Sequence, residues 1–200
     1  MRPTALLAAA AALLLALPAS AQISVGAISD YLNGFRTAAS DFTQVNADGS
    51  ISTGSLAIRR PGSARFDYDA PNAGLVIAGG GQVAVFDPVS NQPPEQYPLS
   101  QTPLSLILAD RVDLGRSGMV VRHGGDATQT AITLQDPANP QYGSIQLVFT
   151  PDPVTLRQWV ITDDTGAQTT VILCDMRTGV QVGSSAFNIP VELQRRGLSN

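Results

Sequence analysis

The chain has few of the residues that catalysis most often uses. Its 200 residues include no lysine, all 12 basic residues being arginine, and only one histidine, one cysteine and one tryptophan. The histidine, His123, precedes Gly124 and Gly125, so we expect a surface residue beside a turn and not a general base. Gly115-Arg116-Ser117-Gly118 has the wrong spacing for the nucleophile elbow G-x-S-x-G. The sequence therefore gives little support for an enzyme, and we expect no catalytic residue and no cofactor.

Metal and phosphate sites are also weakly indicated. Asp163 and Asp164 stand in a D-D-T-G turn, where aspartate is expected for hydrogen bonding to the backbone. Gly79-Gly80-Gly81 is followed by neither a lysine nor a helix start, so it is predicted to be a hairpin turn and not a phosphate-binding loop. We therefore expect no metal site.

The cysteine content and the net charge narrow the possible classes of protein further. Cys174 is the only thiol, so it cannot form an intramolecular disulfide, and we expect it inside a strand as a small apolar group. The formal net charge of −4 at pH 7 argues against a nucleic-acid partner, because phosphate binding needs clustered Lys and Arg. With 44% hydrophobic and 14% charged residues, much apolar side chain must be packed or must line a cavity.

The first 21 residues resemble a secretory signal peptide. Arg2 supplies a positive start, Ala5 to Leu17 an apolar run, and Ala19-Ser20-Ala21 a small-residue cleavage site. The run is too short to cross a bilayer as a helix. We expect an exported, soluble protein, with residues 22–200 forming one domain.

Two helices are predicted beside a large sheet. Ile28, Leu32 and Phe35 have helical spacing within Ser24 to Arg36. Thr102-Pro103 is a favourable helix start, with Thr102 as N-cap, before the apolar segment Leu104 to Leu108. Between Phe86 and Met119 the strand alternation stops, and the prolines of 87–101 disfavour a central strand, so this segment is expected to cross over the sheet.

Alternating hydrophobicity and turn residues predict ten strands in antiparallel hairpins. So many strands in one domain imply a strongly curved sheet or a barrel. The expected strands are Phe42 to Val45, Ser52 to Arg59, Ala64 to Asp69, Leu75 to Ala78, Gln82 to Phe86, Val120 to His123, Gln129 to Leu134, Ser144 to Thr150, Thr155 to Thr162 and Thr169 to Asp175.

Arg60 is the residue whose predicted position, on the apolar face of a strand, costs the most free energy. Strand alternation sends Leu56, Ile58 and Arg60 to the same face. An arginine cannot lose its proton to escape an apolar surface, so it must find a carboxylate, backbone carbonyls or water there. An ordinary ion pair with Asp67 or Asp69 is one explanation, and a functional contact is the other.

The sequence IRRPGSARFDYDAP from Ile58 to Pro71, with DFTQ at Asp41 to Gln44, resembles the periplasmic lipoprotein carrier family, LolA. The resemblance continues in order through GGGQVAVFDP, Thr102 to Leu108, the Asp163 to Gln168 turn, and Phe187 with Pro190. It implies an α+β fold: an unclosed, strongly curved antiparallel β-barrel, or half-barrel, capped by α-helices that form a lid. Arg60 matches the family's arginine that ties the lid to the barrel in the empty form.

The resemblance also implies a function without catalysis. Carriers of this family take triacylated lipoproteins from an inner-membrane ABC transporter and pass them to an outer-membrane acceptor, and we expect a periplasmic monomer that does the same. The alternative is a periplasmic sensor or assembly factor of the same fold that binds lipid or lipoprotein without delivering it. Strand alternation and the apolar residues of the two predicted helices give the residues that we expect to line a lipid-binding cavity. They are Ile28, Leu32, Phe35, Leu56, Ile58, Phe66, Tyr68, Val83, Val85, Leu104, Ile107 and Leu108.

Overall fold

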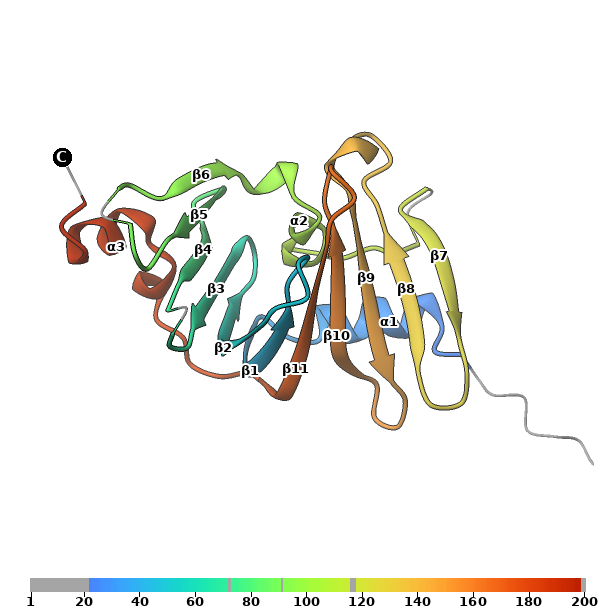
Figure 1. Cartoon of the computed structure of the whole chain (residues 1–200). Helices are drawn as coiled ribbons and strands as arrows, with labels where there is room; N and C mark the ends of the chain where they lie inside the picture. The colour runs from blue at the N-terminus through green and yellow to red at the C-terminus, as the bar shows by residue number, and fades with distance from the viewer. Residues whose placement is uncertain (1–21, 72, 91, 116–117, 199–200) are drawn as a thin grey trace, which may run out of the picture.

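A computed structural model describes residues 22–71, 73–90, 92–115 and 118–198, so the predicted signal peptide, residues 1–21, lies outside the described residues. The described part contains one sheet of eleven antiparallel strands (Figure 1). The α-helices are α1 Val25–Asn33, α2 Leu104–Leu108 and α3 Ile189–Arg195. The strands are β1 Thr37–Val45, β2 Ile51–Arg59, β3 Ser63–Tyr68, β4 Leu75–Gly79, β5 Gln82–Phe86, β6 Glu95–Pro98, β7 Val120–Gly125, β8 Thr130–Leu134, β9 Ser144–Thr150, β10 Thr155–Thr162 and β11 Gln168–Thr178.

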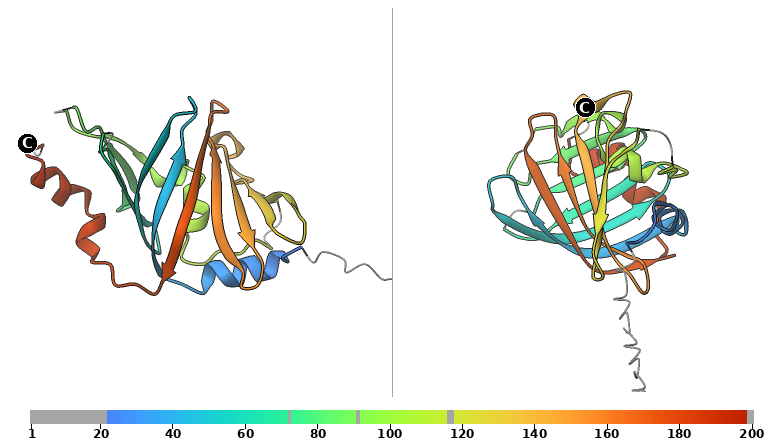
Figure 2. Two further views of the ribbon diagram at one scale, coloured as in Figure 1. Left: turned by 60° about the horizontal axis from the view of Figure 1, so that its bottom comes forward. Right: turned by 90° about the vertical axis from the view of Figure 1, so that its right-hand side faces the viewer.

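The sheet is two meanders joined at their centre. Its order is β6-β5-β4-β3-β2-β1-β11-β10-β9-β8-β7, so β1 from the first half of the chain pairs with β11 from the second half. The edge strands β6 and β7 do not pair with each other, so the barrel stays open. Figure 2 shows how strongly the sheet curves around its concave face. The predicted fold class is thus confirmed: an unclosed, curved antiparallel sheet with few helices.

Side-chain alternation fills the concave face with the main hydrophobic core. In β9 the buried residues are Ile145, Leu147 and Phe149, and in β8 they are Thr130, Ile132 and Leu134. Helix α2, which was predicted as a short apolar helix, packs against the same core through Leu104, Ile107 and Leu108. Together these contacts place α2 inside the curve of the sheet.

Helix α1 begins where its sequence predicted. The Ser24 hydroxyl accepts a hydrogen bond from the Ala27 amide at 3.2 Å, which satisfies one of the free N–H groups of the first turn. The helix ends at Asn33, so Phe35, which was predicted to continue its stripe, is buried in the connection to β1 instead. Edge-to-face contact between Tyr31 and Phe149 at 5.6 Å attaches α1 to β9.

Nine of the ten predicted strands differ from the observed bounds by a few residues at most, but one strand was missed and two local predictions were wrong. The proline-rich segment 87–101 contributes the edge strand β6, since only an edge strand tolerates proline. The Thr102 hydroxyl donates to the Leu99 carbonyl at 2.8 Å in the preceding 3-10 turn, so it does not cap α2. Cys174 does lie in β11, but it is exposed, because Val171 and Leu173 take the inward positions.

The C-terminal segment, which the sequence did not predict to be helical, covers the convex face of β3, β4 and β5. Ile189 of α3 packs with Leu75, Ile77, Ala84 and Phe86, which point away from the main core. The approach is close, because a Cβ atom at Gly79 would overlap the Phe187 carbonyl oxygen. One arm of the sheet is therefore buried on both faces.

Candidate functional site

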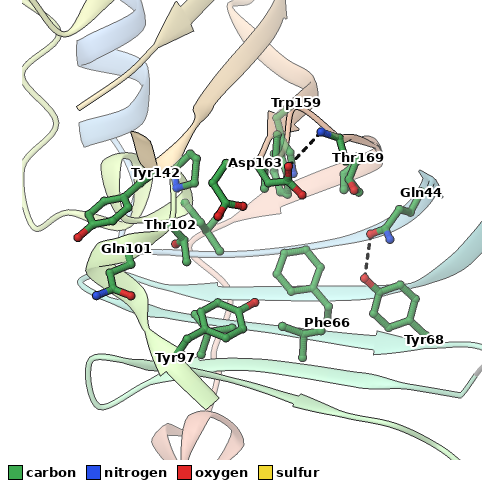
Figure 3. A pocket seen from close by; sticks show the side chains of 18 residues that line it. Gln44, Phe66, Tyr68, Tyr97, Gln101, Thr102, Tyr142, Trp159, Asp163 and Thr169 are labelled. Carbon is green, nitrogen blue, oxygen red and sulfur yellow. Dashed lines mark hydrogen bonds between the residues drawn. The ribbon is translucent and has the colours of Figure 1, made fainter. Parts of the chain in front are cut away.

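A cavity of about 560 Å³ opens on the concave side of the sheet, between β3–β6 on one side and β10 and β11 on the other (Figure 3). Its base is apolar and buried, with Phe66, Val83, Leu104, Trp159 and Val171 in the wall. Its mouth is polar, and the exposed residues there are Tyr97, Gln101, Asp163 and Asp164. The cavity thus offers an apolar interior with a hydrated entrance.

Aromatic rings stabilise the wall of this cavity. Phe66 meets Trp159 edge-to-face at 6.3 Å, and Phe42 meets Phe66 and Tyr68 at 5.7 and 5.2 Å. The Tyr68 hydroxyl donates to Gln44 Oε1 at 2.8 Å, as Figure 3 shows. Burial raises the pKa of Tyr68, an effect that the bond to Gln44 only partly offsets. Tyr68 is therefore neutral at physiological pH.

The aspartates at the mouth do not form a metal site. Asp163 Oδ1 accepts hydrogen bonds from the Thr165 hydroxyl and amide and from the Ala167 amide, which confirms its predicted role in the turn. The Thr165 hydroxyl is the largest cause of the lowered pKa of Asp163. In the described part of the chain no group of three or more His, Cys, Asp or Glu side chains could hold a metal ion.

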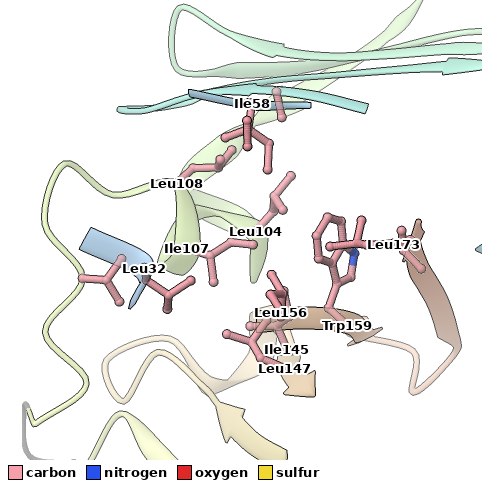
Figure 4. Close-up of a cluster of buried hydrophobic side chains, with 14 of the residues drawn as sticks. Leu32, Ile58, Leu104, Ile107, Leu108, Ile145, Leu147, Leu156, Trp159 and Leu173 are labelled. Carbon is pink, nitrogen blue, oxygen red and sulfur yellow. The ribbon is translucent and has the colours of Figure 1, made fainter. Parts of the chain in front are cut away.

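The structure divides the twelve predicted cavity residues into four that line the cavity, one that does not, and seven in the core. Phe66, Tyr68, Val83 and Leu104 line the cavity. Val85, on the same face of β5 as Val83, is half-buried and is not part of the lining. The other seven are buried in the core around the two helices, where Figure 4 shows several of them: Ile28, Leu32, Phe35, Leu56, Ile58, Ile107 and Leu108. They do not line the cavity in this structure, because α2 fills that part of the concave face, and their contact with lipid stays a prediction.

Several lining residues were missing from the predicted set. Trp159 and Ile161 of β10 and Val171 of β11 all face the cavity. The alternation of these two strands, which places Trp159 and Ile161 on one face, was the signal that could have identified them. Tyr97 lies in the four-residue edge strand β6 and Tyr142 in a three-residue 3-10 turn, and both elements are too short for a periodic pattern to identify them.

Arg60 lies just beyond β2 and is only 5% exposed. Its Nε and Nη2 donate to the Ala109 carbonyl at 3.0 and 2.7 Å, and Nη2 also donates to the Asp110 carbonyl at 3.3 Å. Nη1 donates to the Leu32 carbonyl and, at 3.5 Å, to the Phe35 carbonyl. One guanidinium thus joins the sheet to the ends of both α1 and α2.

The acceptors of Arg60 are available because helices end there. The last carbonyls of a helix have no intrahelical partner, and Leu32 lies in the last turn of α1, while Ala109 directly follows α2. A cation at a helix C-terminus is favoured as well. Burial lowers the pKa of Arg60, with a smaller effect from Arg36, but a guanidinium remains protonated.

The alternative of an ion pair with Asp67 or Asp69 is wrong. Asp67 is paired with Arg65 at 2.7 Å, and Asp69 accepts from the Thr53 hydroxyl at 2.7 Å. Within the described ranges no carboxylate forms a salt bridge with Arg60. Its positive charge therefore faces backbone carbonyl dipoles and not a carboxylate.

Asn33 and Arg36 reinforce the same junction. Asn33 donates to the Val112 carbonyl at 2.8 Å and accepts from the Val112 amide at 2.9 Å, so it ties α1 to the loop after α2. Asn33 Oδ1 also lies 3.3 Å from Arg60 Nη2. Arg36 bonds the Asp110 carbonyl at 2.8 Å. We use the word lid below for α1, α2 and the loop 109–114 together.

The fold and the site define a half-barrel whose apolar cavity is covered by a helical lid. The family model described as "Outer membrane lipoprotein carrier protein LolA" matches residues 33–190. An outer-membrane lipoprotein carrier protein of Pseudomonas aeruginosa is 27% identical over 177 residues, covering 84% of each chain. One of Chromohalobacter salexigens is 25% identical, covering 88% of this chain and 89% of the other. The chain belongs to the LolA family.

A solved LolA superfamily protein from Nitrosomonas europaea is also similar, with a TM-score of 0.43 and 12% identity over 83% of this chain and 98% of the other. Among the described residues, none of the helices has the length and apolar character that a membrane span requires.

Proposed function

We propose that this protein is a periplasmic, non-enzymatic carrier of lipoproteins. It would receive triacylated lipoproteins from an inner-membrane ABC transporter, shield their acyl chains, and deliver them to an acceptor in the outer membrane. Residues 1–21 would act as the export signal and residues 22–200 as a single, monomeric carrier domain. The observation that carries this proposal is the apolar cavity under a lid that one buried arginine holds to the sheet.

The energetics explain why such a carrier is needed. The acyl chains of a triacylated lipoprotein contain on the order of 45 methylenes, and exposing each to water costs about 0.8 kcal/mol. Free diffusion across an aqueous compartment is therefore excluded. A carrier has to offset most of this cost, but it also has to give the lipid up.

The size of the cavity suggests that the lid moves. Sites of about 300–1,000 Å³ enclose one drug-sized ligand, and the cavity of about 560 Å³ lies in that range. Three acyl chains need more room, and the buried side chains of α2 occupy the adjoining space. Opening the lid would add the surface of Ile107 and Leu108 to the lining.

In this scheme Arg60 acts as a latch. Its hydrogen bonds to the ends of α1 and α2 stabilise the closed, empty form, so closure competes with bound lipid and lowers the net affinity. Because the acceptors are backbone carbonyls at helix ends, water can replace Arg60 when the lid opens.

A transfer experiment tests the carrier function. The protein is expected to form a soluble one-to-one complex with a triacylated lipoprotein, to release it from inner-membrane vesicles that contain the transporter, and to pass it to the acceptor. Binding without delivery would favour a sensor. Depletion in the native cell, followed by membrane fractionation, should leave outer-membrane lipoproteins in the inner membrane, and normal sorting would contradict the proposal.

Filling the cavity should block loading without unfolding the protein. Val76 is half-buried and lines the cavity, so Val76→Phe places a ring in space that lipid would occupy. We expect at least a tenfold loss of lipoprotein binding in a pull-down titration, with the melting temperature nearly unchanged because the space is open. Val160→Phe is the matched control, since Val160 is equally half-buried but points away from the cavity next to inward-facing Trp159. Equal loss in both variants would remove the cavity from the binding site.

A further inference from the structure

Trp159 carries a buried donor that the closed structure leaves without a partner. The residue lies in the middle of β10, between Leu147 of β9 and Val171 of β11, and its ring forms part of the cavity wall. Its side chain is 0% exposed. Within the part of the chain that the structure describes, Nε1 has no hydrogen-bond partner.

Such an arrangement is unusual in a folded protein. The indole N–H can only donate, and a buried donor without an acceptor costs about 1–3 kcal/mol. Buried polar groups in native structures nearly always find partners, so each exception calls for an explanation. Here the neighbours explain why none is found: Phe66 packs edge-to-face on Trp159, and Val171 and Leu173, two of the inward-facing residues of β11, have no acceptor in their side chains.

The other polar groups of the cavity do not share this property. Tyr68 and Gln44 are hydrogen-bonded to each other. Tyr97, Gln101 and Asp164 are at the exposed mouth, where water can reach them. Trp159 therefore carries the fully buried cavity-wall donor that has no partner among the described residues, and an acceptor for it would have to come from a molecule that enters the cavity and displaces the side chains covering Nε1.

We propose that the Trp159 N–H donates a hydrogen bond to an ester carbonyl oxygen of the cargo lipid. This inference rests on the proposed carrier function and names the part of the cargo that this site recognises. An ester-linked acyl chain is apolar except for its linkage, which accepts hydrogen bonds and has none to donate. It is thus complementary to an apolar wall with one free donor. The chains lie at the base of the cavity, and the peptide leaves through the mouth between Tyr97 and Asp164.

The consequence is selectivity for acyl over alkyl lipids. An ether-linked chain buries the same methylenes but has no carbonyl, so it leaves the N–H unpaired. One buried hydrogen bond contributes a net of about 0.5–1.5 kcal/mol, which corresponds to roughly a threefold to tenfold preference for the ester.

The test removes the Trp159 N–H group from the protein and, separately, the ester carbonyls from the lipid. Trp159 is the only tryptophan of the chain, so residue-wide replacement of tryptophan by 3-benzothienylalanine, in which sulfur stands for N–H, alters this site alone. The probes are two synthetic lipopeptides with the same N-acyl chain and the same chain lengths, one with two ester-linked chains and the other with two ether-linked chains. Affinities are measured by calorimetry.

We expect the unmodified protein to bind the diester about threefold to tenfold more tightly than the diether, and the substituted protein to bind both equally. Trp159→Phe should also lose the preference, and Val171→Ala, which alters packing but no donor, should keep it. If substitution leaves the ratio unchanged, or weakens both probes alike, ester recognition by Trp159 is wrong while the carrier function stands. If the unmodified protein binds neither probe, the proposed function itself fails.

Discussion

Arg60→Leu is expected to keep its cargo and to fail in handing it over. Leucine cannot donate to the Leu32 and Ala109 carbonyls, which would then be buried without partners in the closed form but hydrated in the open form. At about 1–3 kcal/mol for each unsatisfied group, the lid equilibrium should shift toward the open form by roughly 30-fold or more. The affinity of the protein for lipid should rise by the same factor, because less free energy is lost on opening the lid. Transfer to the acceptor should therefore slow at least tenfold, while loading persists. The measurement is the rate at which a purified complex passes lipoprotein to the acceptor.

The neighbouring arginine provides the control. Arg59 belongs to the same segment but is exposed on the opposite face, so Arg59→Leu should transfer at the normal rate. Arg60→Lys should be intermediate, because a single ammonium group cannot span both helix ends as the planar guanidinium does. If Arg60→Leu delivers lipoprotein as fast as the unmodified protein, Arg60 is not a latch.

Glu192→Gln is expected to release the C-terminal segment from the sheet. Glu192 is only 4% exposed and accepts from Arg196 at 2.9 Å, Arg195 at 3.0 Å and Arg65 at 3.3 Å. The substitution leaves half-buried Arg65 with Asp67 as its only carboxylate partner, beside the Ala186 carbonyl at 3.1 Å, and removing one member of a buried charge network is strongly destabilising. Because two of the arginines are partly exposed, we expect a loss of about 2 kcal/mol in the free energy of unfolding.

Hydrogen exchange separates local from global effects of this change. Faster exchange should be confined to residues 184–198 and to the strands β4 and β5 that they cover. Glu95→Gln is the control, since the only other glutamate of the chain is exposed on edge strand β6. Unchanged exchange in 184–198 would mean that apolar contacts of Ile189 alone hold the segment.

The same network predicts a pH dependence. Burial by itself would raise the pKa of Glu192, but the hydrogen bond from Arg196 and the charges of Arg65 and Arg195 outweigh burial, and the pKa is lowered on folding. The unfolded chain therefore binds the proton more readily, so this stabilisation is complete above the usual glutamate range and is lost as the pH falls below about 4. Glu192→Gln should consequently lose less stability than the unmodified protein between pH 5 and pH 3, as measured by urea unfolding. Equal slopes would contradict the prediction.

The sequence predicts those elements of the fold that depend on neighbouring residues, and it misses those that depend on residues far away in the chain. Strands β9 and β10 have the predicted bounds, because alternation is a local signal and each is bounded by turn residues. Helix α3 was missed because its short apolar stripe is buried only by packing on the convex face of β4 and β5, strands that lie more than 100 residues earlier in the chain. The Thr102 cap was wrong because the Leu99 carbonyl competes for the same hydroxyl.

The candidate site shows the same division. Alternation correctly placed Phe66, Tyr68 and Val83 on the concave side. It could not say which concave positions face empty space and which face α2, because that depends on where the chain between β6 and β7 enters the curve of the sheet. Seven predicted lining residues were therefore found in the core instead.

The sequence by itself determined that Arg60 points to the apolar face, since the period of a strand leaves no choice, and that it needs hydrogen-bond acceptors there. Only the tertiary structure decided which acceptors it has. The carbonyls of residues 32–35 and 109–110 become available because two helices end at the same point of the barrel, brought together by burial of their apolar faces. The unpaired N–H of Trp159 likewise follows from the packing around it, and no local pattern encodes that.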